Sequence, residues 1–583
     1  MTPATDTYLL LRAFVDELAR CGLRDACTSP GSRCTPLVLS LAREPRLRCH
    51  SHIDERCAGF FAVGLAKASG RPVAVTCTSG TAAAELLPAA IEAHEAGVPL
   101  LILTADRPPE LRENGAGQTI DQIKLYGDAA KWFFEVGTPE ASEGGLHWMR
   151  TLACRAYWRS LEGRPGVVHL NFPLREPLVI GEEVPLPHDG TGRPDEAPYV
   201  RRPTAHLHAP DAMAELSTLL ASCTRGVVVA GRHELGAPLA AAAEFCAAAR
   251  WPLLADPLSG ARRGEAAVAH YDALLRNPAF AAEMRPDVVI RVGALPTSKP
   301  LRQWLVGLRD VPQVLLDPVG DWQDPEAMLS DSFAVDPVQA LSELAGDRLE
   351  ISPDWLAGWR SADERASEAI LGVLGAEGLC EPAVAAELGV LLPEQATLFV
   401  ASSMPVRDIE SFWPVRADPP RVLCNRGANG IDGTVSSAFG AAAEGHGPVV
   451  LLIGDVALAH DIGGLIAARR LELDLTIVLI DNGGGGIFDF LGVAGAPMAQ
   501  AGDLYTLHIA TPTGLDFALA AQLYGLEHEA VADVVSFRAA LERALTPRPG
   551  RSRIIEVRTD RARNVELHRR AWEAVAGVLD GGA

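Results

Sequence analysis

The sequence lacks most features that mark secreted, membrane-bound or metal-stapled proteins. Its 11 cysteines form no CxxC pair and no cluster with histidines, which argues for a reduced intracellular protein rather than a disulfide framework or a zinc site. No apolar run approaches the roughly 20 residues that span a bilayer. The first segment, MTPATDTYLLLRAFVDEL, lacks the basic start of a signal peptide and has the pattern of an amphipathic helix. We therefore expect a cytoplasmic protein with no integral membrane association.

Positive charge is also in deficit. The chain has 52 Lys and Arg against 74 Asp and Glu, a formal net charge of -22. This balance argues against a protein that coats phosphate backbones or anionic membranes, so we expect no nucleic-acid partner. It does not exclude a local basic pocket for a small acidic substrate. Aromatic residues are few (6%), but hydrophobic residues reach 48%, which excludes intrinsic disorder.

Short apolar runs recur along the chain and alternate with Ala-rich stretches of helical character. Such runs, apolar on both faces and separated by helices, indicate parallel sheets covered on both sides. The 583 residues suggest three or four domains of roughly 150 residues each. The sequence therefore predicts an α/β protein made of doubly wound parallel-sheet domains. The runs cover residues 73–77, 100–104, 167–170, 227–230, 288–292, 449–453 and 476–480.

Two stretches without periodicity divide this pattern. Residues 181–210 are rich in Pro, His, Gly and Asp, and residues 347–354 precede a new helix that carries Trp355 and Trp359. We interpret both stretches as linkers. The middle domain has no GxGxxG run, so binding of FAD or NAD is not expected there. Whether the first and third domains share a fold does not follow from one sequence. The predicted domains are residues 1–185, 205–346 and 355–583.

Polar residues follow two strands of the third predicted domain. One strand ends in Gly454 and Asp455, and the next ends in Asp481, Asn482 and four glycines. Open α/β sheets bind ligands at the carboxyl ends of adjacent strands. An Asp carboxylate, an Asn amide oxygen and a carbonyl of the glycine turn suit Mg²⁺, and the glycines let the backbone approach a diphosphate. A strand-end Asp alone commonly caps the next helix, so the signal is the pair of loops.

This pair of loops resembles the diphosphate-binding motif of thiamine-diphosphate enzymes, in which GDG is followed by NN. Val456 replaces the last Gly and Asp481 replaces the first Asn. The resemblance implies thiamine diphosphate and Mg²⁺, with Mn²⁺ as a substitute, and assigns Asp455, Asn482 and the Gly484 carbonyl as metal ligands. In that family the cofactor lies between the pyrimidine-binding domain of one subunit and the diphosphate-binding domain of its neighbour. We therefore expect residues 1–185 and 355–583 to form these domains in at least a homodimer, with a homotetramer as the favoured assembly.

The first predicted domain contains a candidate acid and several anion-binding loops. Glu55 precedes an expected helix, where an acid is commonly present only because the helix dipole favours it. The resemblance implies instead that Glu55 holds the cofactor's pyrimidine ring. The segment SPGSR offers backbone N–H groups, Ser32 and Arg33 at a helix start. Taken singly, Arg33 and Arg107 are typical of surface ion pairs, and Gln118 is typical of a loop amide.

Seven segments together resemble a narrower family, the 2-succinyl-5-enolpyruvyl-6-hydroxy-3-cyclohexene-1-carboxylate synthases of menaquinone biosynthesis. These transferases decarboxylate 2-oxoglutarate and add the resulting succinyl-semialdehyde carbanion to isochorismate. The resemblance covers essentially the whole chain, and SPGSR and NRGANGIDG are its specific motifs. The segments are SPGSR, HSHIDER, TSGTA, LTADRPPEL, GAGQ, FVASSMPVRDIE and CNRGANGIDGTVS.

The resemblance also assigns site residues. Arginines are expected among them, because a planar guanidinium group pairs well with the carboxylates that both substrates carry. Lys299 is the weaker assignment, because Pro300 stands where the family often has a second basic residue. The implied cofactor-binding residues are Glu55, Ser79, Gly80, Ile431, Gly454, Asp455, Asn482, Gly484, Ile487 and Phe488. The implied substrate-binding residues are Ser32, Arg33, Arg107, Gln118, Lys299, Ser403, Arg407 and Arg426. The catalytic candidates are Glu55, Arg33, Gln118, Arg407 and Arg426.

Two other functions stay open at this point. Another thiamine-diphosphate 2-oxoacid decarboxylase or carboligase would share the cofactor motif, although the Arg-rich segments favour a tricarboxylate product. A non-catalytic nucleotide-binding α/β protein would share the fold without the chemistry. The joint presence of Glu55, Asp455 and Asn482 argues against this second alternative.

Overall fold

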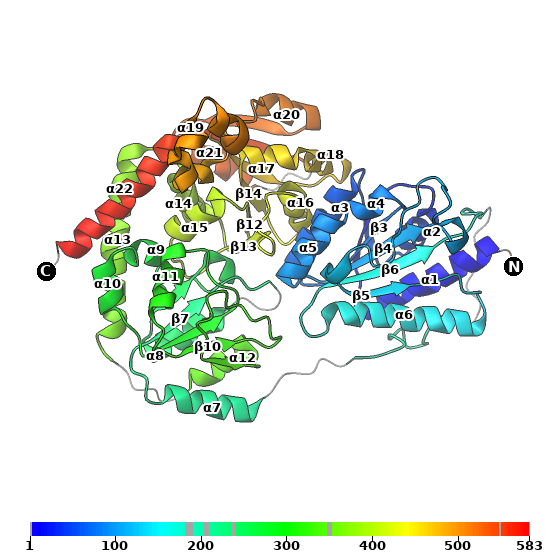
Figure 1. Cartoon of the computed structure of the whole chain (residues 1–583), viewed down its shortest axis with the longest axis horizontal. Helices are drawn as coiled ribbons and strands as arrows, with labels where there is room; N and C mark the ends of the chain where they lie inside the picture. The colour runs from blue at the N-terminus through cyan, green and yellow to red at the C-terminus, as the bar shows by residue number, and fades with distance from the viewer. Residues whose placement is uncertain are drawn as a thin grey trace. The chain divides into compact units, whose positions relative to one another are not determined.

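Three parallel sheets carry the fold (Figure 1). The computed structural model describes residues 3–180, 191–202, 209–234, 239–346, 352–546 and 550–581. Every pair of neighbouring strands in the three sheets is parallel. The predicted α/β class is therefore confirmed. The domain boundaries stay a prediction, and most of both predicted linkers lies outside the described residues.

The first sheet has the strand order β2-β1-β3-β4-β6-β5. Helices α1 and α6 lie side by side on one face, and α3 and α5 cover the other (Figure 1). The strands are β1 (Asp25–Thr28), β2 (Arg48–Ser51), β3 (Val73–Cys77), β4 (Leu100–Asp106), β5 (Ala130–Glu135) and β6 (Val167–Pro173). The helices are α1 (Pro3–Cys21), α2 (Thr35–Ala42), α3 (Glu55–Ser69), α4 (Thr81–Ala84), α5 (Leu87–Ala96) and α6 (Glu143–Leu161).

The middle sheet has the order β11-β10-β9-β7-β8. Its central strands β7 and β9 are buried along their whole length, as their continuous apolar runs predict. The strands are β7 (Gly226–Ala230), β8 (Leu253–Ala255), β9 (Val288–Val292), β10 (Gln313–Leu316) and β11 (Asp331–Phe333). The helices are α7 (Pro210–Leu220), α8 (Ala240–Ala249), α9 (Tyr271–Leu274), α10 (Pro278–Glu283), α11 (Lys299–Gly307) and α12 (Pro337–Leu344).

The third sheet has the order β13-β12-β14-β15-β17-β16, which repeats the connectivity of the first. The two sheets thus share a topology that a single sequence did not reveal. The strands are β12 (Thr397–Val400), β13 (Arg421–Cys424), β14 (Val449–Gly454), β15 (Thr476–Asp481), β16 (Glu527–Val531) and β17 (Arg553–Arg558). The helices in this part of the chain, of which α16 and α18 fall in a different compact unit from the sheet, are α13 (Trp355–Glu377), α14 (Glu381–Leu391), α15 (Met404–Phe412), α16 (Thr434–Glu444), α17 (Asp455–His460), α18 (Ile466–Arg470), α19 (Pro497–Gln500), α20 (Phe517–Tyr524), α21 (Val534–Ala544) and α22 (Arg561–Asp580).

The chain divides into two compact units that do not follow the sheet order. The first comprises residues 1–205, 425–445 and 461–473, and the second comprises residues 206–424, 446–460 and 474–583. Helix α16 therefore belongs to the first unit, where it packs along α3. A Cβ on Gly64 of α3 would lie 1.9 Å from the Ser437 carbonyl oxygen, and one on Gly440 would lie 2.0 Å from that of Phe61. Glycine on both helices thus permits the close approach of their backbones.

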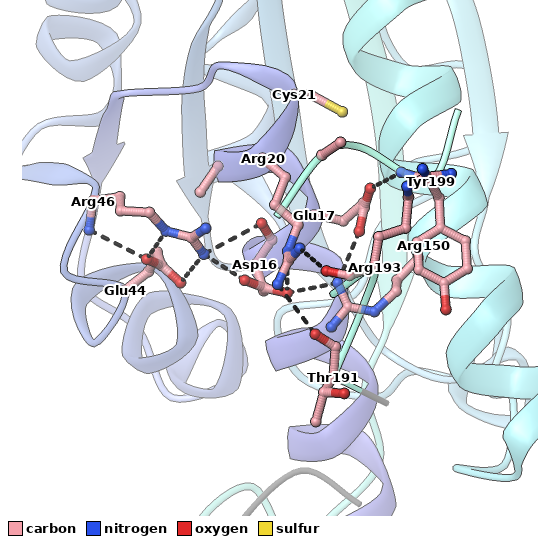
Figure 2. A network of polar contacts seen from close by, with 12 residues as sticks. Asp16, Glu17, Arg20, Cys21, Glu44, Arg46, Arg150, Thr191, Arg193 and Tyr199 are labelled. Carbon is pink, nitrogen blue, oxygen red and sulfur yellow. Dashed lines mark hydrogen bonds and ion pairs between the residues drawn. The ribbon is translucent and has the colours of Figure 1, made fainter. Parts of the chain in front are cut away.

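A buried polar network fastens the described part of the first predicted linker to α1 and α6 (Figure 2). The fully buried Arg150 of α6 donates to Asp16 Oδ2 at 2.6 Å and to Glu17 Oε2 at 2.8 Å. The other oxygen of Glu17 accepts from the Tyr199 N–H at 2.6 Å. Residues 191–202 contain no helix or strand, in line with their aperiodic sequence. Because the buried Glu17 carboxylate and the Arg20 guanidinium hold this backbone, we expect it to move with the first unit.

Within the described ranges, no single helix has the length and hydropathy of a membrane span. Helices α13 and α14 meet the criterion only as a pair, and they are bent by 116° at the break between them. Trp355 and Trp359 of α13 are buried in the core of the second unit, which confirms the helix predicted there.

Candidate functional site

The two predicted loops of the third sheet do lie side by side. Strands β14 and β15 are parallel neighbours, with Gly454 opposite Ile480. Asp455 begins α17 directly after β14, and Asn482 follows the last residue of β15. The Gly484 N–H donates to Asp455 Oδ2 at 2.8 Å and so ties the glycine loop to the first loop. The expected adjacency of the two strand ends is therefore confirmed.

The oxygen atoms at this edge fit a hard divalent cation. Asn482 Nδ2 donates to Glu381 Oε1 at 2.9 Å, whereas Asn482 Oδ1 is buried and has no hydrogen-bond partner in the described chain. The Gly484 carbonyl accepts from the Gly486 N–H at 2.9 Å and retains its second lone pair. Together with the Asp455 carboxylate, these atoms make an all-oxygen donor set of the kind that Mg²⁺ and Mn²⁺ prefer.

Burial and negative charge both act on Asp455. Burial, with a smaller contribution from Asp481, raises the pKa of its carboxyl to about 6, although hydrogen bonds from the N–H groups of Val456 and Gly484 oppose the shift. Asp481 is one of the two departures from the family motif, so this departure adds a carboxylate beside the proposed ligand. A bound divalent cation would favour the ionised form of Asp455.

The glycine loop approaches its surroundings too closely for side chains. Gly484 has φ 135°, and a Cβ there would lie 2.5 Å from the Ala510 carbonyl oxygen. Ile487 and Phe488, both half-buried, lie on the short 3-10 helix Gly486–Phe490 that follows. A Cβ on Gly485 would lie 2.8 Å from the Phe488 ring. The backbone groups of the glycine loop can thus approach a diphosphate closely. The apolar side chains of Ile487 and Phe488 that follow are suited to exclude water beside it.

Glu55 is the first residue of α3, so the helix begins one residue earlier than the sequence predicts. Asp54 caps the helix by accepting from the N–H groups of Arg56 and Cys57, so the capping role belongs to Asp54 and not to Glu55. Burial raises the pKa of Glu55, with smaller contributions from Asp54 and Glu85. A half-buried carboxyl with a raised pKa is suited to share a proton with a ligand nitrogen.

Both Nη atoms of the Arg33 guanidinium group already donate hydrogen bonds to other residues of the protein. Its Nη1 donates to the Leu174 carbonyl at 2.8 Å and its Nη2 to Glu176 Oε1 at 3.1 Å. Arg33 is 7% exposed, whereas Glu176 is mostly exposed. Ser32 lies exposed on the turn before α2. A substrate carboxylate at Arg33 would therefore compete with Glu176.

The other candidates on the first sheet lie together after β3 and β4. Arg107 Nη1 contacts the Ser79 hydroxyl, and Ser79 and Gln118 exchange two hydrogen bonds of 3.0 Å through their side chains and carbonyls. Burial lowers the pKa of Arg107, and the nearby Arg33 lowers it further. Gly80, at φ 86°, would bring a Cβ within 3.0 Å of Gln118. Two cations this close attract an anion.

The loop that carries Arg426 and Ile431 is anchored by a residue that sequence reasoning missed. Glu92 of α5, 3% exposed, accepts from the Gly427 N–H at 3.0 Å and from the Ala428 N–H at 2.7 Å. Lys67 of α3, fully buried, pairs with the same carboxylate at 3.1 Å. Arg426 and Ile431 are both half-buried. Lys67 and Glu92 sit among apolar residues of their helices, and that pattern was the available signal of a buried ion pair.

The remaining candidates begin helices of the second unit. Ser403 precedes α15 with φ 75°, a conformation that costs a non-glycine residue about 1–3 kcal/mol and is concentrated at functional sites. Its carbonyl accepts from Arg407 Nη1. Lys299 is the exposed first residue of α11, and Pro300 follows in the first turn. Proline suits that position, so the departure from the family pattern is structurally compatible with the helix start.

The chain matches three family profiles in sequence order. Residues 10–125 match the thiamine pyrophosphate enzyme, N-terminal TPP binding domain. Residues 194–400 match the middle domain of thiamine pyrophosphate, and residues 406–557 match the thiamine pyrophosphate enzyme, C-terminal TPP binding domain.

Curated relatives resemble the chain over nearly its whole length. A protein of Chloroflexus aurantiacus is 42% identical over 97% of this chain and 96% of the relative. One of Geobacillus kaustophilus is 44% identical over 97% of both chains, and one of Listeria monocytogenes is 40% identical over 98% of this chain and 97% of the relative. Each is named 2-succinyl-5-enolpyruvyl-6-hydroxy-3-cyclohexene-1-carboxylate synthase.

Proposed function

Because the chain belongs to the 2-succinyl-5-enolpyruvyl-6-hydroxy-3-cyclohexene-1-carboxylate synthases, a family of thiamine-diphosphate enzymes, we propose that it makes this product from 2-oxoglutarate and isochorismate. The reaction releases CO₂, transfers the remaining four-carbon unit to isochorismate and belongs to menaquinone biosynthesis. The observation that carries this conclusion is the identity of 40–44% along nearly the full chain. It favours the synthase over both another 2-oxoacid decarboxylase and a non-catalytic protein.

Thiamine diphosphate supplies the electron sink for the loss of CO₂ and for the transfer of the four-carbon unit. Asp455, Asn482 and the Gly484 carbonyl would hold Mg²⁺, or Mn²⁺ in its place, against the diphosphate. The unpartnered Asn482 Oδ1 and the crowded Cβ position of Gly484 support this assignment. Gly454, Ser79 and Gly80 are the further backbone and hydroxyl contacts that we assign to the cofactor.

Glu55 would hold a proton at the pyrimidine ring nitrogen, and the raised pKa of its carboxyl supports that role. Ile431 would support the cofactor, and Ile487 and Phe488 would exclude water from it. In the family arrangement the pyrimidine-binding and diphosphate-binding domains at one site come from two subunits. We therefore propose at least a homodimer, with a homotetramer favoured, and light scattering on the purified protein tests this. A cytoplasmic location remains a prediction.

The substrates carry several carboxylates, and the candidate cations would neutralise them in the pocket. Arg107 beside Arg33, together with Arg407 and Arg426, provides the planar forks that such groups need. Within the described residues Arg426 makes no ion pair, which leaves its charge available to a ligand. Ser32, Gln118, Lys299 and Ser403 complete the proposed set.

The experiment combines binding with turnover. Calorimetry should detect binding of thiamine diphosphate that depends on Mg²⁺. The loaded protein should then consume isochorismate, followed by its ultraviolet absorbance, when 2-oxoglutarate is present. Pyruvate in place of 2-oxoglutarate is the control and should give little consumption. Absence of isochorismate loss from protein that is fully loaded with the cofactor would contradict the proposed substrates.

A further inference from the structure

We propose that Glu381 is a positioning residue that orients the Asn482 carboxamide, so that the amide oxygen and not its NH₂ group faces the divalent cation. The inference rests on the proposed function, because it assumes a metal held by Asp455 and Asn482. It concerns a residue that lies outside the two motif loops, at the start of a helix far away in the sequence.

Glu381 bridges the ends of two neighbouring strands. It is the first residue of α14 and is 3% exposed. Its Oε1 accepts from Asn482 Nδ2 at 2.9 Å and from the Thr559 hydroxyl at 2.9 Å. Asn482 follows β15 and Thr559 follows β17, and these strands are parallel neighbours. One carboxyl oxygen therefore joins both strand ends at the edge of the sheet where the cation would lie.

The contact selects one orientation of the amide. A carboxamide has a donor end and an acceptor end of nearly the same shape. If the amide turned over, its oxygen would face an oxygen that already accepts from Thr559. Glu381 therefore favours the orientation with Nδ2 inward and Oδ1 toward the ligand loops.

In this orientation the amide oxygen of Asn482 is left available to bind a ligand. Asn482 Oδ1 is buried without a hydrogen-bond partner in the described chain, and an unsatisfied buried acceptor costs about 1–3 kcal/mol. A cation bound by Oδ1 would remove this cost. Glu381 is also close enough to Asp408 and Asp455 for their charges to act on it. A divalent cation would offset this concentration of carboxylates.

The test measures metal affinity directly in the full-length protein with thiamine diphosphate, using electron paramagnetic resonance of Mn²⁺. Glu381→Ala should weaken Mn²⁺ binding about 10–100-fold, the usual effect of removing a group that orients a metal ligand. Turnover should recover at saturating Mg²⁺. Glu381→Gln should retain most of the affinity, because its amide oxygen can accept from Asn482. Glu387→Gln is the matched control, since Glu387 lies on the same helix and pairs with Arg538 at the surface.

A double variant separates orientation from structural support. An Asp at position 482 presents an oxygen in either orientation, so Glu381→Ala combined with Asn482→Asp should bind Mn²⁺ more tightly than Glu381→Ala alone. Asn482→Asp alone should bind weakly, because two carboxylates then face each other. A purely structural role for Glu381 predicts no such compensation.

Three results would overturn the inference. The first is wild-type Mn²⁺ affinity in Glu381→Ala. The second is equal weakening in Glu381→Gln and Glu381→Ala. The third is that Asn482→Asp does not restore the Mn²⁺ affinity lost in Glu381→Ala and that excess Mg²⁺ does not restore its turnover. If Glu381→Ala does not fold, as judged by circular dichroism, the inference is tested by the Mn²⁺ affinities of Glu381→Gln and Asn482→Asp. The first should be close to that of the wild type, and the second should be weak. A wild-type protein that binds no Mn²⁺ with thiamine diphosphate would instead refute the proposed function itself.

Discussion

Replacing Glu92 by Ala should destabilise the first unit strongly, because it removes a carboxylate that pairs with a fully buried cation. Lys67 has no exposed surface and Glu92 is 3% exposed. Breaking a buried ion pair by removing one member costs about 3–5 kcal/mol. The N–H groups of Gly427 and Ala428 also lose their acceptor, which contributes about 0.5–1.5 kcal/mol for each bond. We therefore expect a loss at the upper end of the range, about 5 kcal/mol.

Differential scanning calorimetry of the full chain is the suitable assay. The transition that includes the first unit should move down by about 2–4 °C per kcal/mol, if it behaves as a domain of 150–250 residues. The double variant Lys67→Met with Glu92→Leu removes both charges and should lose much less than Glu92→Ala alone. A second readout is KM, which should rise for the substrates because Gly427 directly follows Arg426. A stability change below about 0.5 kcal/mol in Glu92→Ala would refute the reasoning.

Three further predictions concern the site and the response to pH. Glu55→Gln should keep thiamine diphosphate bound, by calorimetry, while turnover falls about 10²–10⁴-fold; near-normal turnover would contradict its role. Gly484→Ala should abolish tight cofactor binding because its Cβ would meet the Ala510 carbonyl, whereas Gly483→Ala, which has a left-handed φ of 72° but open space around its Cβ, should incur backbone strain without that clash and lose less; equal effects would be evidence against the loop geometry. Burial lowers the pKa of His169 to about 3, so the unfolded chain takes up a proton first as the pH falls below about 6.5. The contribution of His169 therefore lowers the free energy of unfolding as the pH falls from 6.5 to 3, by up to about 1.4 kcal/mol per pH unit. Urea unfolding of His169→Gln should show a shallower pH dependence over that window, and an unchanged dependence would exclude this contribution.

Much of the sheet architecture could be predicted from the sequence. The runs at residues 73–77 and 288–292 coincide with β3 and β9, because strands buried on both faces leave an unbroken apolar signal. The adjacency of the loops that carry Asp455 and Asn482 was also predictable, since a crossover connection commonly returns the chain to the neighbouring strand.

The supporting residues were not predictable in the same way. Glu92 binds backbone groups 335 residues away in the sequence, and Glu381 reaches Asn482 across 101 residues. No local pattern encodes such pairings, which depend on how helices pack against loops. The engagement of Arg33 by Leu174 and Glu176 has the same origin. The shared topology of the first and third sheets became visible from strand pairing and not from sequence similarity.

The most direct test of the central claim is the stoichiometry between CO₂ release and isochorismate consumption. The full-length protein with thiamine diphosphate and Mg²⁺ would receive 2-oxoglutarate labelled with ¹³C at C1, with and without isochorismate. We predict one labelled CO₂ for each isochorismate consumed and a product whose mass equals isochorismate plus the unlabelled four-carbon unit. Labelled CO₂ released at the same rate without isochorismate, or isochorismate left unchanged, would contradict the account.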